Sequence, residues 1–362
     1  MKFISQGTYG CVYSSNTRKK KDTNNNNHNE IQTVSKIQMI NDDDKETIFG
    51  KTIQTIFQYE SFFAPILETQ PIDIGRIEKK ETNKCNIFQL GTKQYVSSKI
   101  RYVGKITIDD YILNNTLNYK TQRRTVFETH LHLLKGIQKL LLLQNPIIHN
   151  DLKYNNILID KIYDVPIIID FGLSFTFTEL QETLLQTEKM KSLFFSYKPY
   201  LPWNIEFTLL SFIAKNILLN QKKYVNFHID KIEKHLSLLY KVIHSFVKNN
   251  FVFIENDQEK DLFIQKMNHY IQSFRTKTFK DLLQDLLKNW KSWDNYSLAM
   301  MFYEIIITNF SKKQDHYIDT YKQLLLNIIL NTPDITRSLP MDTHQSILTL
   351  CQKNKIRSSL IS

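Results

Sequence analysis

Two polar motifs, each next to a short apolar segment, constrain this chain more than any other feature. The first, residues 149–156, reads HNDLKYNN and is followed by the apolar run Ile157–Ile159. The second is Asp170-Phe171-Gly172, and it follows the apolar run Pro166–Ile169. Such apolar runs predict buried strands, so both motifs place charged and amide groups at the border of a folded core.

Each polar residue of these motifs has a chemical use. Asp151 can accept the proton of a hydroxyl group or orient an attacking oxygen, and Lys153 can neutralise a transferred phosphoryl group. Asn156, five residues after Asp151, can bind a metal ion. Asp170 can hold Mg²⁺, because this ion prefers hard oxygen ligands. The sequence therefore predicts Asp151 and Lys153 as catalytic residues, with Asn156 and Asp170 as metal ligands.

A glycine-containing turn near the N-terminus is a further candidate site. It reads Ile4-Ser5-Gln6-Gly7-Thr8-Tyr9-Gly10-Cys11-Val12, within a segment that predicts a β-hairpin over 1–14. Backbone N–H groups of such a turn can cover nucleotide phosphates, with Val12 packed on the base and Cys11 nearby. Ser5 replaces the first glycine of the pattern GxGxxGxV, so an ordinary hairpin explains the segment equally well.

A lysine and a helix with an acidic start follow the hairpin. Lys36, in a predicted strand, can reach the α- and β-phosphates of a nucleotide, although an isolated strand lysine more often faces water. Asp42-Asp43-Asp44 predicts the start of a helix that runs through 47–58, since acidic residues stabilise the first turn.

The pattern of the chain changes near Val103–Lys105. Three segments before this point predict further strands: 71–78, 85–90 and 94–103. After it, apolar residues recur at helical spacing. We therefore predict an α+β fold, with a small β-rich lobe over 1–103 and a large helical lobe over 104–362. Within the large lobe, residues 213–290 predict an inserted helical subdomain, with a docking surface as the alternative.

With these motifs in this order, the sequence resembles the eukaryotic-type protein kinase family over nearly its whole length. The resemblance implies a two-lobed kinase-like fold that binds ATP and Mg²⁺ between the lobes. It implies that Lys36 is the ATP lysine and that Val103 lies in the adenine-binding hinge, near 102–104. It also implies that Lys36 pairs with a glutamate of the helix that follows, for which Glu46, one turn into the helix, is favoured over Glu60 near its end. Lys153, two residues after Asp151, follows the pattern of serine/threonine kinases. The implied reaction is transfer of the γ-phosphoryl group of ATP to a serine or threonine hydroxyl on a protein.

Two downstream segments extend the resemblance. Ser292–Ala299 resembles the DxWSLG segment of a central buried helix, whose aspartate, here Asp294, would support the catalytic loop. A simple helix N-cap is the alternative for Asp294. Pro202–Glu206 is a loose version of the APE segment, which implies that Glu206 pairs with a late arginine, Arg337. A surface position for Glu206 is equally consistent with the sequence.

One residue departs from the family pattern within the strongest motif. Asn150 stands where the family usually has an arginine that grips a phosphorylated activation loop. We therefore expect activity to depend only weakly on phosphorylation of Thr183, Thr187 or Ser192. The asparagine tract 24–27 and the low glycine content also resemble kinases of large DNA viruses.

Three other functions share part of the pattern. A small-molecule phosphotransferase of the aminoglycoside or choline type uses HxDxxxxN but usually lacks the lysine and the DFG motif. A Bud32-like atypical kinase has a sequence similar to residues 168–174 of this chain, but such kinases are much shorter than this chain. A pseudokinase would act as a binding scaffold, and it is disfavoured because Lys36, Asp151, Asn156 and Asp170 are all present.

Composition indicates which partners and which cellular compartment to expect. Lys and Arg exceed Asp and Glu by 47 − 36 = 11, but the charge is dispersed, so we expect no nucleic-acid partner. Cys11, Cys85 and Cys351 are odd in number and far apart, which predicts neither a disulfide framework nor a metal site. No apolar run is long enough for a signal peptide or a membrane span. We expect a soluble monomer that acts on a protein substrate in a reducing compartment, the cytoplasm (the host cytoplasm for a viral protein).

Overall fold

The computed structural model of the chain describes residues 1–7, 10–14, 33–40, 45–89, 94–113, 117–160, 162–183, 187–194, 196, 198, 200–217, 233–311 and 314–353. Several predicted features lie outside the described residues: Thr8 and Tyr9 at the tip of the glycine turn, the asparagine tract 24–27, and Asp42–Asp44. The predictions made for them stay predictions.

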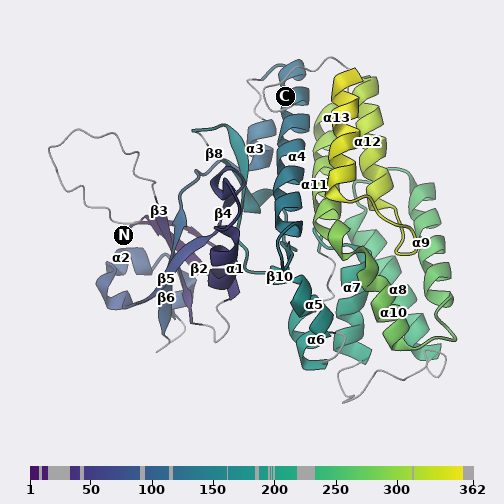
Figure 1. Ribbon diagram of the computed structural model, residues 1–362, viewed down its shortest axis with the longest axis horizontal. Coiled ribbons are helices and arrows are strands. Elements are labelled where there is room, and N and C mark those ends of the chain that lie inside the picture. The colour runs from purple at the N-terminus through teal and green to yellow at the C-terminus, as the bar shows by residue number, and fades with distance from the viewer. Residues whose placement is uncertain are drawn as a thin grey trace. The chain divides into compact units, whose positions relative to one another are not determined.

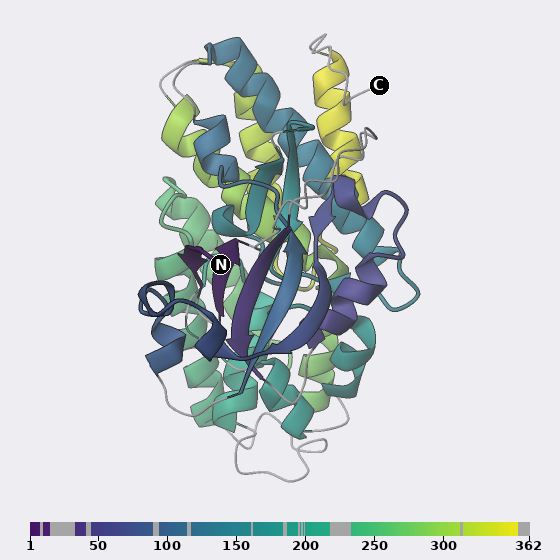
Figure 2. The same ribbon diagram turned by 90° about the vertical axis from the view of Figure 1, so that its left-hand side faces the viewer.

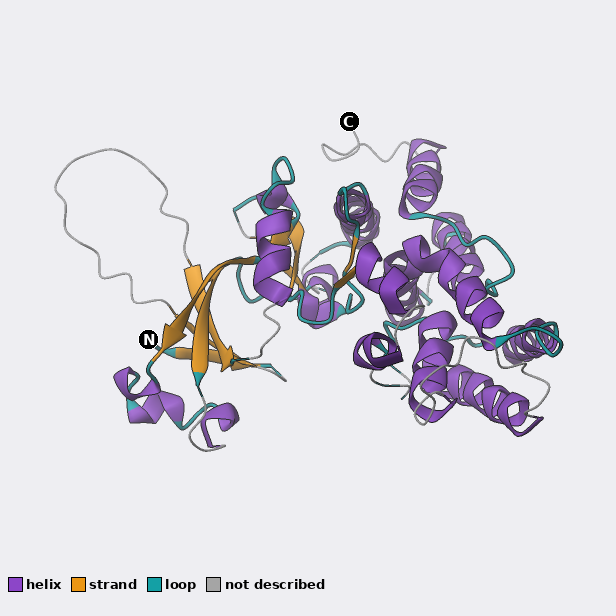
Figure 3. Cartoon of the chain, turned by 60° about the horizontal axis from the view of Figure 1, so that its bottom comes forward, coloured by secondary structure: helices purple, strands orange, loops and turns teal. Residues whose placement is uncertain are grey.

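Two compact units make up the chain. The first consists of Met1–Ile106 and Leu158–Gly172, and the second consists of Thr107–Ile157 and Leu173–Ser362. The N-terminal region is built on a β-sheet and the C-terminal region is largely helical (Figures 1 and 3), which confirms the predicted α+β class. The sequence analysis assigns all residues from 104 onward to one lobe, whereas residues 158–172, which include the whole DFG motif and the strand before it, belong to the first unit.

An antiparallel five-stranded sheet in the order β1-β2-β3-β6-β5 is the framework of the first unit (Figure 2). Its strands are β1 (Phe3–Gln6), β2 (Gly10–Ser14), β3 (Thr33–Met39), β5 (Ile66–Ile72) and β6 (Tyr95–Arg101). A smaller sheet has the order β4-β9-β8, with β4 (Phe63–Ala64), β8 (Ile157–Asp160) and β9 (Val165–Ile169). The helical parts are α1 (Lys45–Ile53), α2 (Lys79–Thr82) and 3₁₀ turns at Tyr59–Ser61, Ile74–Arg76 and Asn86–Gln89.

Residues 73–89, here called the cap segment, cover one face of the large sheet. Side chains alternate along a strand, so Cys11 and Ile37, which are paired in register, point to the same face. On that face the sheet and the cap segment bury one apolar cluster: Cys11, Tyr13, Ile37, Ile77, Cys85, Ile87 and Tyr95. The predicted strands over 71–78 and 85–90 are wrong for the cap segment. Its apolar side chains reach the sheet from short helical turns instead of joining it as strands.

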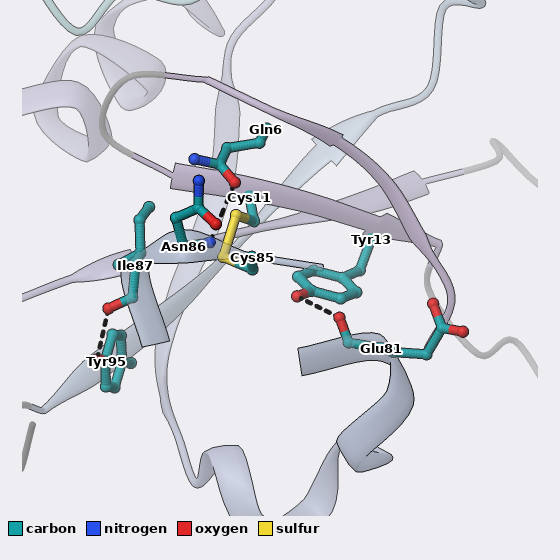
Figure 4. The surroundings of a disulfide bond; sticks show 8 residues. All are labelled: Gln6, Cys11, Tyr13, Glu81, Cys85, Asn86, Ile87 and Tyr95. Atoms are coloured by element: carbon teal, nitrogen blue, oxygen red, sulfur yellow. Dashed lines mark hydrogen bonds between the residues drawn. A yellow bond between two sulfur atoms is a disulfide. The ribbon is translucent and has the colours of Figure 1, made fainter. Parts of the chain in front are cut away.

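A disulfide between Cys11 and Cys85 joins strand β2 to the cap segment (Figure 4). The two cysteines are 74 residues apart in sequence, and their Cα atoms are 6.1 Å apart. Hydrogen bonds join the neighbouring strand β1 to the cap segment: the N–H of Phe3 donates to the Glu81 carboxylate at 2.8 Å. The N–H of Asn86 donates to the Gln6 side-chain oxygen at 3.1 Å.

This disulfide overturns two predictions from the sequence. Cys11 and Cys85 are bonded to each other and fully buried, so the expectation of no disulfide is wrong. A disulfide does not favour a reducing compartment, so the compartment predicted from cysteine usage is not supported either. The pairing was missed because a separation of 74 residues leaves no local spacing pattern to recognise. Cys351 is a free, buried thiol.

The second unit is a set of packed helices. Its elements in chain order are α3 (Ile108–Ile112), α4 (Tyr119–Leu141), β7 (Ile147–Ile148), a 3₁₀ turn (Tyr154–Asn156), β10 (Phe175–Thr176), α5 (Phe177–Thr183), α6 (Thr187–Leu193), α7 (Ile205–Phe212), a π-helical turn (Ile213–Ile217), α8 (Glu233–Asn250), α9 (Asp257–Gln272), α10 (Phe279–Leu286), a 3₁₀ turn (Leu287–Ser292), α11 (Trp293–Phe310), α12 (His316–Ile329) and α13 (Pro340–Lys353). Strands β7 and β10 pair with each other.

Helix α11 is the centre of the second unit. It is buried along most of its length, and α4 and α12 both pack against it. A helix that is apolar on all sides belongs in the core of a domain. In the predicted insertion, α8 and α9 pack together through the buried rings of Phe246, Phe251 and Phe263. None of the described helices combines the length and the apolar character needed to cross a bilayer.

The disulfide gives a stability prediction for the first unit. A crosslink that closes a loop this long restricts the unfolded chain, and its removal typically costs about 2–4 kcal/mol. We expect Cys85→Ser to lower the melting temperature of the non-reduced protein by several degrees. The reductant should have little further effect on that variant, because it has no crosslink left to break.

The matched control is Cys351→Ser, which removes the free thiol. This variant should keep the shift in melting temperature that a reductant causes in the wild type. Titration of three free thiols in the denatured, non-reduced wild type would contradict the crosslink.

Candidate functional site

The structure groups the predicted site residues in two clusters, one in each unit. Lys36, Glu46 and Asp170 form the first cluster. Asp151, Lys153 and Asn156 form the second, together with Tyr200, which the sequence analysis did not find. Each cluster is held by strands, helices and loops of its own unit.

Lys36 lies on β3 and points to the sheet face opposite the cap segment. It is paired in register with Val12 of β2, so the two side chains share this face. The Nζ atom of Lys36 donates to both carboxylate oxygens of Glu46 and to Oδ1 of Asp170, each at 2.9 Å. The predicted partner Glu46 is confirmed, whereas Glu60 lies beyond the end of α1. Lys36 is therefore not the water-facing strand lysine that was the alternative.

The two carboxylates keep Lys36 charged. Burial alone would lower the pKa of this ammonium group, but the charges of Glu46 and Asp170 raise the pKa above its ordinary value. Lys36 is therefore a cation at neutral pH and can bind an anion such as a phosphate. The Asp170 side chain is 45% exposed, so a ligand can reach it.

Gly50 allows helix α1 to lie very close to strand β5. A Cβ atom at this position would be 2.0 Å from the backbone oxygen of Ile66, a distance that no side chain tolerates. One turn earlier, the hydroxyl oxygens of Thr47 and Thr69 are 2.7 Å apart. This close packing brings the neighbouring Glu46 within reach of Lys36.

The glycine turn is a β-hairpin, as the sequence predicts. Strands β1 and β2 pair in antiparallel fashion, and the N–H of Gly7 donates to the carbonyl oxygen of Gly10 at 2.8 Å. Val12 shares the sheet face of Lys36. The Cys11 side chain points to the opposite face and is disulfide-bonded, so it does not face the side of the sheet that carries Lys36, and the predicted contact of Cys11 with a nucleotide stays a prediction. The Gln6 side chain is likewise bound to the cap segment.

Strand β9 positions Asp170. It pairs in parallel with β4, where Ile168 lies opposite Phe63. Phe171 is buried and meets the Phe63 ring edge-on, with 6.1 Å between the ring centroids. Asp170 itself has φ of 61°, in the left-handed region that non-glycine residues seldom adopt. An anchored phenylalanine and a turned backbone thus leave the carboxylate directed at Lys36.

The predicted hinge, Tyr102–Gly104, follows β6 directly. Val103 is buried, and Gly104 has φ of 140°, which glycine adopts readily. The expected contact of these residues with an adenine base stays a prediction.

Asp294 at the start of α11 holds the HNDLKYNN loop of the second unit. Its two carboxylate oxygens accept the backbone N–H groups of His149 and Asn150 at 2.8 and 2.9 Å. Burial raises the pKa of this carboxyl group, and the two N–H groups oppose that rise. The predicted support of the loop by Asp294 is therefore confirmed. The alternative, that Asp294 is only a helix N-cap, is wrong because Ser292 is the N-cap residue of α11.

Asp151 is surrounded by hydrogen-bond donors. Its Oδ2 atom accepts from Asn156 Nδ2 at 2.8 Å and from Lys153 Nζ at 2.9 Å. Its Oδ1 atom accepts from the hydroxyl of Tyr200 at 2.5 Å. Lys153 also donates to the oxygen of that hydroxyl at 2.7 Å. The structure thus brings an acid-base group, a cation, an amide and a hydroxyl to one point.

Two further residues that the sequence analysis did not find contact Tyr200. Trp203 meets its ring edge-on at 4.9 Å and donates from Nε1 to the carbonyl oxygen of Asn150 at 2.9 Å. Asn250, at the end of α8, donates to the carbonyl oxygen of Tyr200 at 3.2 Å. These contacts join residues far apart in sequence, and no short motif contains them.

Glu206 and Arg337 form a fully buried ion pair. The distance between Arg337 Nη1 and Glu206 Oε1 is 2.9 Å, and both side chains are 0% exposed. The pairing predicted from the sequence is confirmed, and a surface position for Glu206 is wrong. The pair ties the start of α7 to the segment before α13.

Each cluster contains one of the two predicted metal ligands. In the part of the chain that the structure describes, no three His, Cys, Asp or Glu side chains form a metal-binding group. Mg²⁺ commonly uses only one or two protein oxygens and takes its other ligands from water and substrate phosphates. In the first cluster the accessible carboxylate of Asp170 is a donor of this kind. In the second cluster Asn156 is buried and its Nδ2 atom donates to Asp151, and its role as a metal ligand stays a prediction.

No protein-family model matches the chain, and no curated protein matches it either. What the two clusters can do therefore follows from their own chemistry. The first can bind an anion at a buried ammonium group. The second can take a proton from a hydroxyl group with a cation beside it.

The support given by Asp294 leads to a prediction. In Asp294→Asn an NH₂ group replaces one accepting oxygen, so one of the two backbone N–H groups loses its buried acceptor. We expect a loss of about 1.5–3 kcal/mol in the free energy of unfolding, and faster hydrogen exchange at the amides of His149 and Asn150. The matched control is Asp257→Asn on the surface of α9, which should stay within about 0.5 kcal/mol of the wild type. Unchanged exchange at both amides in Asp294→Asn would contradict the assignment.

Proposed function

We propose that this chain is an ATP-dependent protein kinase that phosphorylates serine or threonine hydroxyls, with a two-lobed kinase-like fold. The observation that carries the proposal is the contact of Lys36 with both Glu46 and Asp170. These residues come from three separate segments of the chain, and each was singled out from the sequence. An ordinary strand lysine would have no reason to meet both carboxylates.

In this proposal Lys36 binds the α- and β-phosphates of ATP and the turn at Gly7–Gly10 covers the phosphates. Asp170 and Asn156 are the residues that would hold Mg²⁺. The ion, when bound, neutralises phosphate charge. The high pKa of Lys36 supports its part, because the group must stay cationic while it binds phosphate.

The second cluster supplies the groups that act on the acceptor. Asp151 orients the acceptor hydroxyl and takes its proton, and Lys153 neutralises the transferred group. The contacts that Asp151 makes with a hydroxyl and with Lys153 support both roles, since the same hydrogen bonds serve a bound substrate. Catalysis of this kind depends mainly on positioning and charge neutralisation.

Loss of the phosphate-binding charge tests the proposal. We expect Lys36→Met to lower the rate of phosphoryl transfer by about 10²–10³-fold, the usual effect of removing one stabilising group. Transfer is measured with labelled ATP, Mg²⁺ and a library of serine and threonine peptides. Lys99→Met is the matched control, because Lys99 lies in the same sheet and pairs with a carboxylate, Glu68, at the surface. It should transfer at the rate of the wild type.

Two results would contradict the proposal in different ways. A wild-type chain that is stabilised by ATP against heat but transfers no phosphoryl group would be a binding scaffold. A chain that phosphorylates aminoglycosides or choline but no peptide would be a small-molecule phosphotransferase.

A further inference from the structure

The hydroxyl of Tyr200 is bound by both charged residues of the HNDLKYNN loop. It donates to Oδ1 of Asp151 at 2.5 Å and accepts from Nζ of Lys153 at 2.7 Å. A general base must lie within hydrogen-bond reach of the atom whose proton it takes, and Asp151 Oδ1, 2.5 Å from the Tyr200 oxygen, is within that reach. Tyr200 thus makes the contacts that the proposed function requires of an acceptor hydroxyl.

Tyr200 is held in this position by packing on the same unit. Trp203 packs on its ring and is itself hydrogen-bonded to the loop at Asn150. Asn250 fixes the backbone oxygen of Tyr200. A side chain that is held from two sides loses little further freedom when it reacts.

We infer that Tyr200 is a self-phosphorylation site, and that the chain modifies it within one molecule before or between turnovers on other acceptors. The inference rests on the proposed function, because ATP must supply the phosphoryl group. It goes beyond that function by naming an acceptor of a different chemical class, a phenol in the chain itself.

Transfer to Tyr200 forms one bond to phosphorus and breaks one. The Tyr200 oxygen forms a bond to the γ-phosphorus of ATP, and the bond from that phosphorus to the β,γ-bridging oxygen breaks, so ADP leaves. The proton of Tyr200 passes to Asp151 and from there to water. Burial and the Asp151 contact raise the pKa of Tyr200 to about 12, so the hydroxyl is protonated at neutral pH and needs such a base.

The chain need not act on free tyrosine peptides for this to occur. A tethered group has a high effective concentration, and orientation alone can supply several kcal/mol of the barrier to reaction. Lys153 follows the serine/threonine pattern for external substrates, while Tyr200 reaches Asp151 because its own backbone carries it there.

The test begins with full-length protein treated with a phosphatase and then freed of it. After addition of ATP and Mg²⁺, mass spectrometry should find one phosphoryl group on Tyr200. The initial rate per molecule should not change across a dilution series, because the reaction is intramolecular. Asp151→Asn should lower this rate by at least about a hundredfold, and its stabilisation by ATP against heat shows that it is folded.

Two tyrosine variants complete the design. Tyr200→Phe should lose the phosphotyrosine signal and keep its stabilisation by ATP. Tyr163→Phe, at an exposed tyrosine in the first unit, should incorporate phosphate on Tyr200 like the wild type.

Phosphorylation of serine or threonine peptides with Tyr200 left unmodified would overturn the inference and leave the proposed function intact. A rate per molecule that rises with protein concentration would overturn it as well, because the reaction would then occur between molecules. A chain that transfers no phosphoryl group to any hydroxyl would remove the proposed function and the inference together.

Discussion

The buried carboxylate of Asp294 fixes the backbone on which the second cluster is built. A carboxylate away from water costs several kcal/mol unless donors compensate it, and here two consecutive backbone N–H groups do so. Asn150, the second donor, takes φ of 61°, a conformation that asparagine tolerates better than most residues. Asp151 follows directly in the chain, so its direction is set by the turn that Asp294 holds.

The first unit separates stability and chemistry onto opposite faces of one sheet. Neighbouring residues of β2 point to different faces, so Cys11 joins the apolar cluster under the cap segment while Val12 lies beside Lys36. The same alternation on β3 places Ile37 in the cluster and Lys36 on the other face. One face can therefore be crosslinked and fully buried, while the other carries an ammonium group and two carboxylates, of which Asp170 is open to solvent.

Features that lie within a short stretch of sequence were predictable. The HNDLKYNN loop, the DFG motif and the helical spacing of the second half are local patterns. The residues that define each pattern stand close together in the sequence, so the pattern can be recognised without knowledge of the fold. The pairing of Lys36 with Glu46 was predictable from the family resemblance, because Glu46 lies one turn into the predicted helix that follows the strand of Lys36.

Features that depend on contacts between distant residues were not predictable. The disulfide and the cap segment join residues more than seventy positions apart, and periodicity alone cannot tell a strand from short turns that face a sheet. Tyr200 was missed for the same reason, since its partner Asp151 lies 49 residues earlier and only the fold brings them together. Tertiary packing, and not local preference, decides such positions.

Gly50 shows how an absent group can set the geometry of a charged one. The space that its missing Cβ leaves is filled by the backbone oxygen of Ile66, and backbone cannot move aside as the end of a side chain can. Every substitution at this position, even by alanine, must push α1 off the sheet and draw the Glu46 carboxylate away from Lys36. The exposed residues of that helix are free of this constraint. Residue 50 must be glycine, although glycine has no functional group of its own.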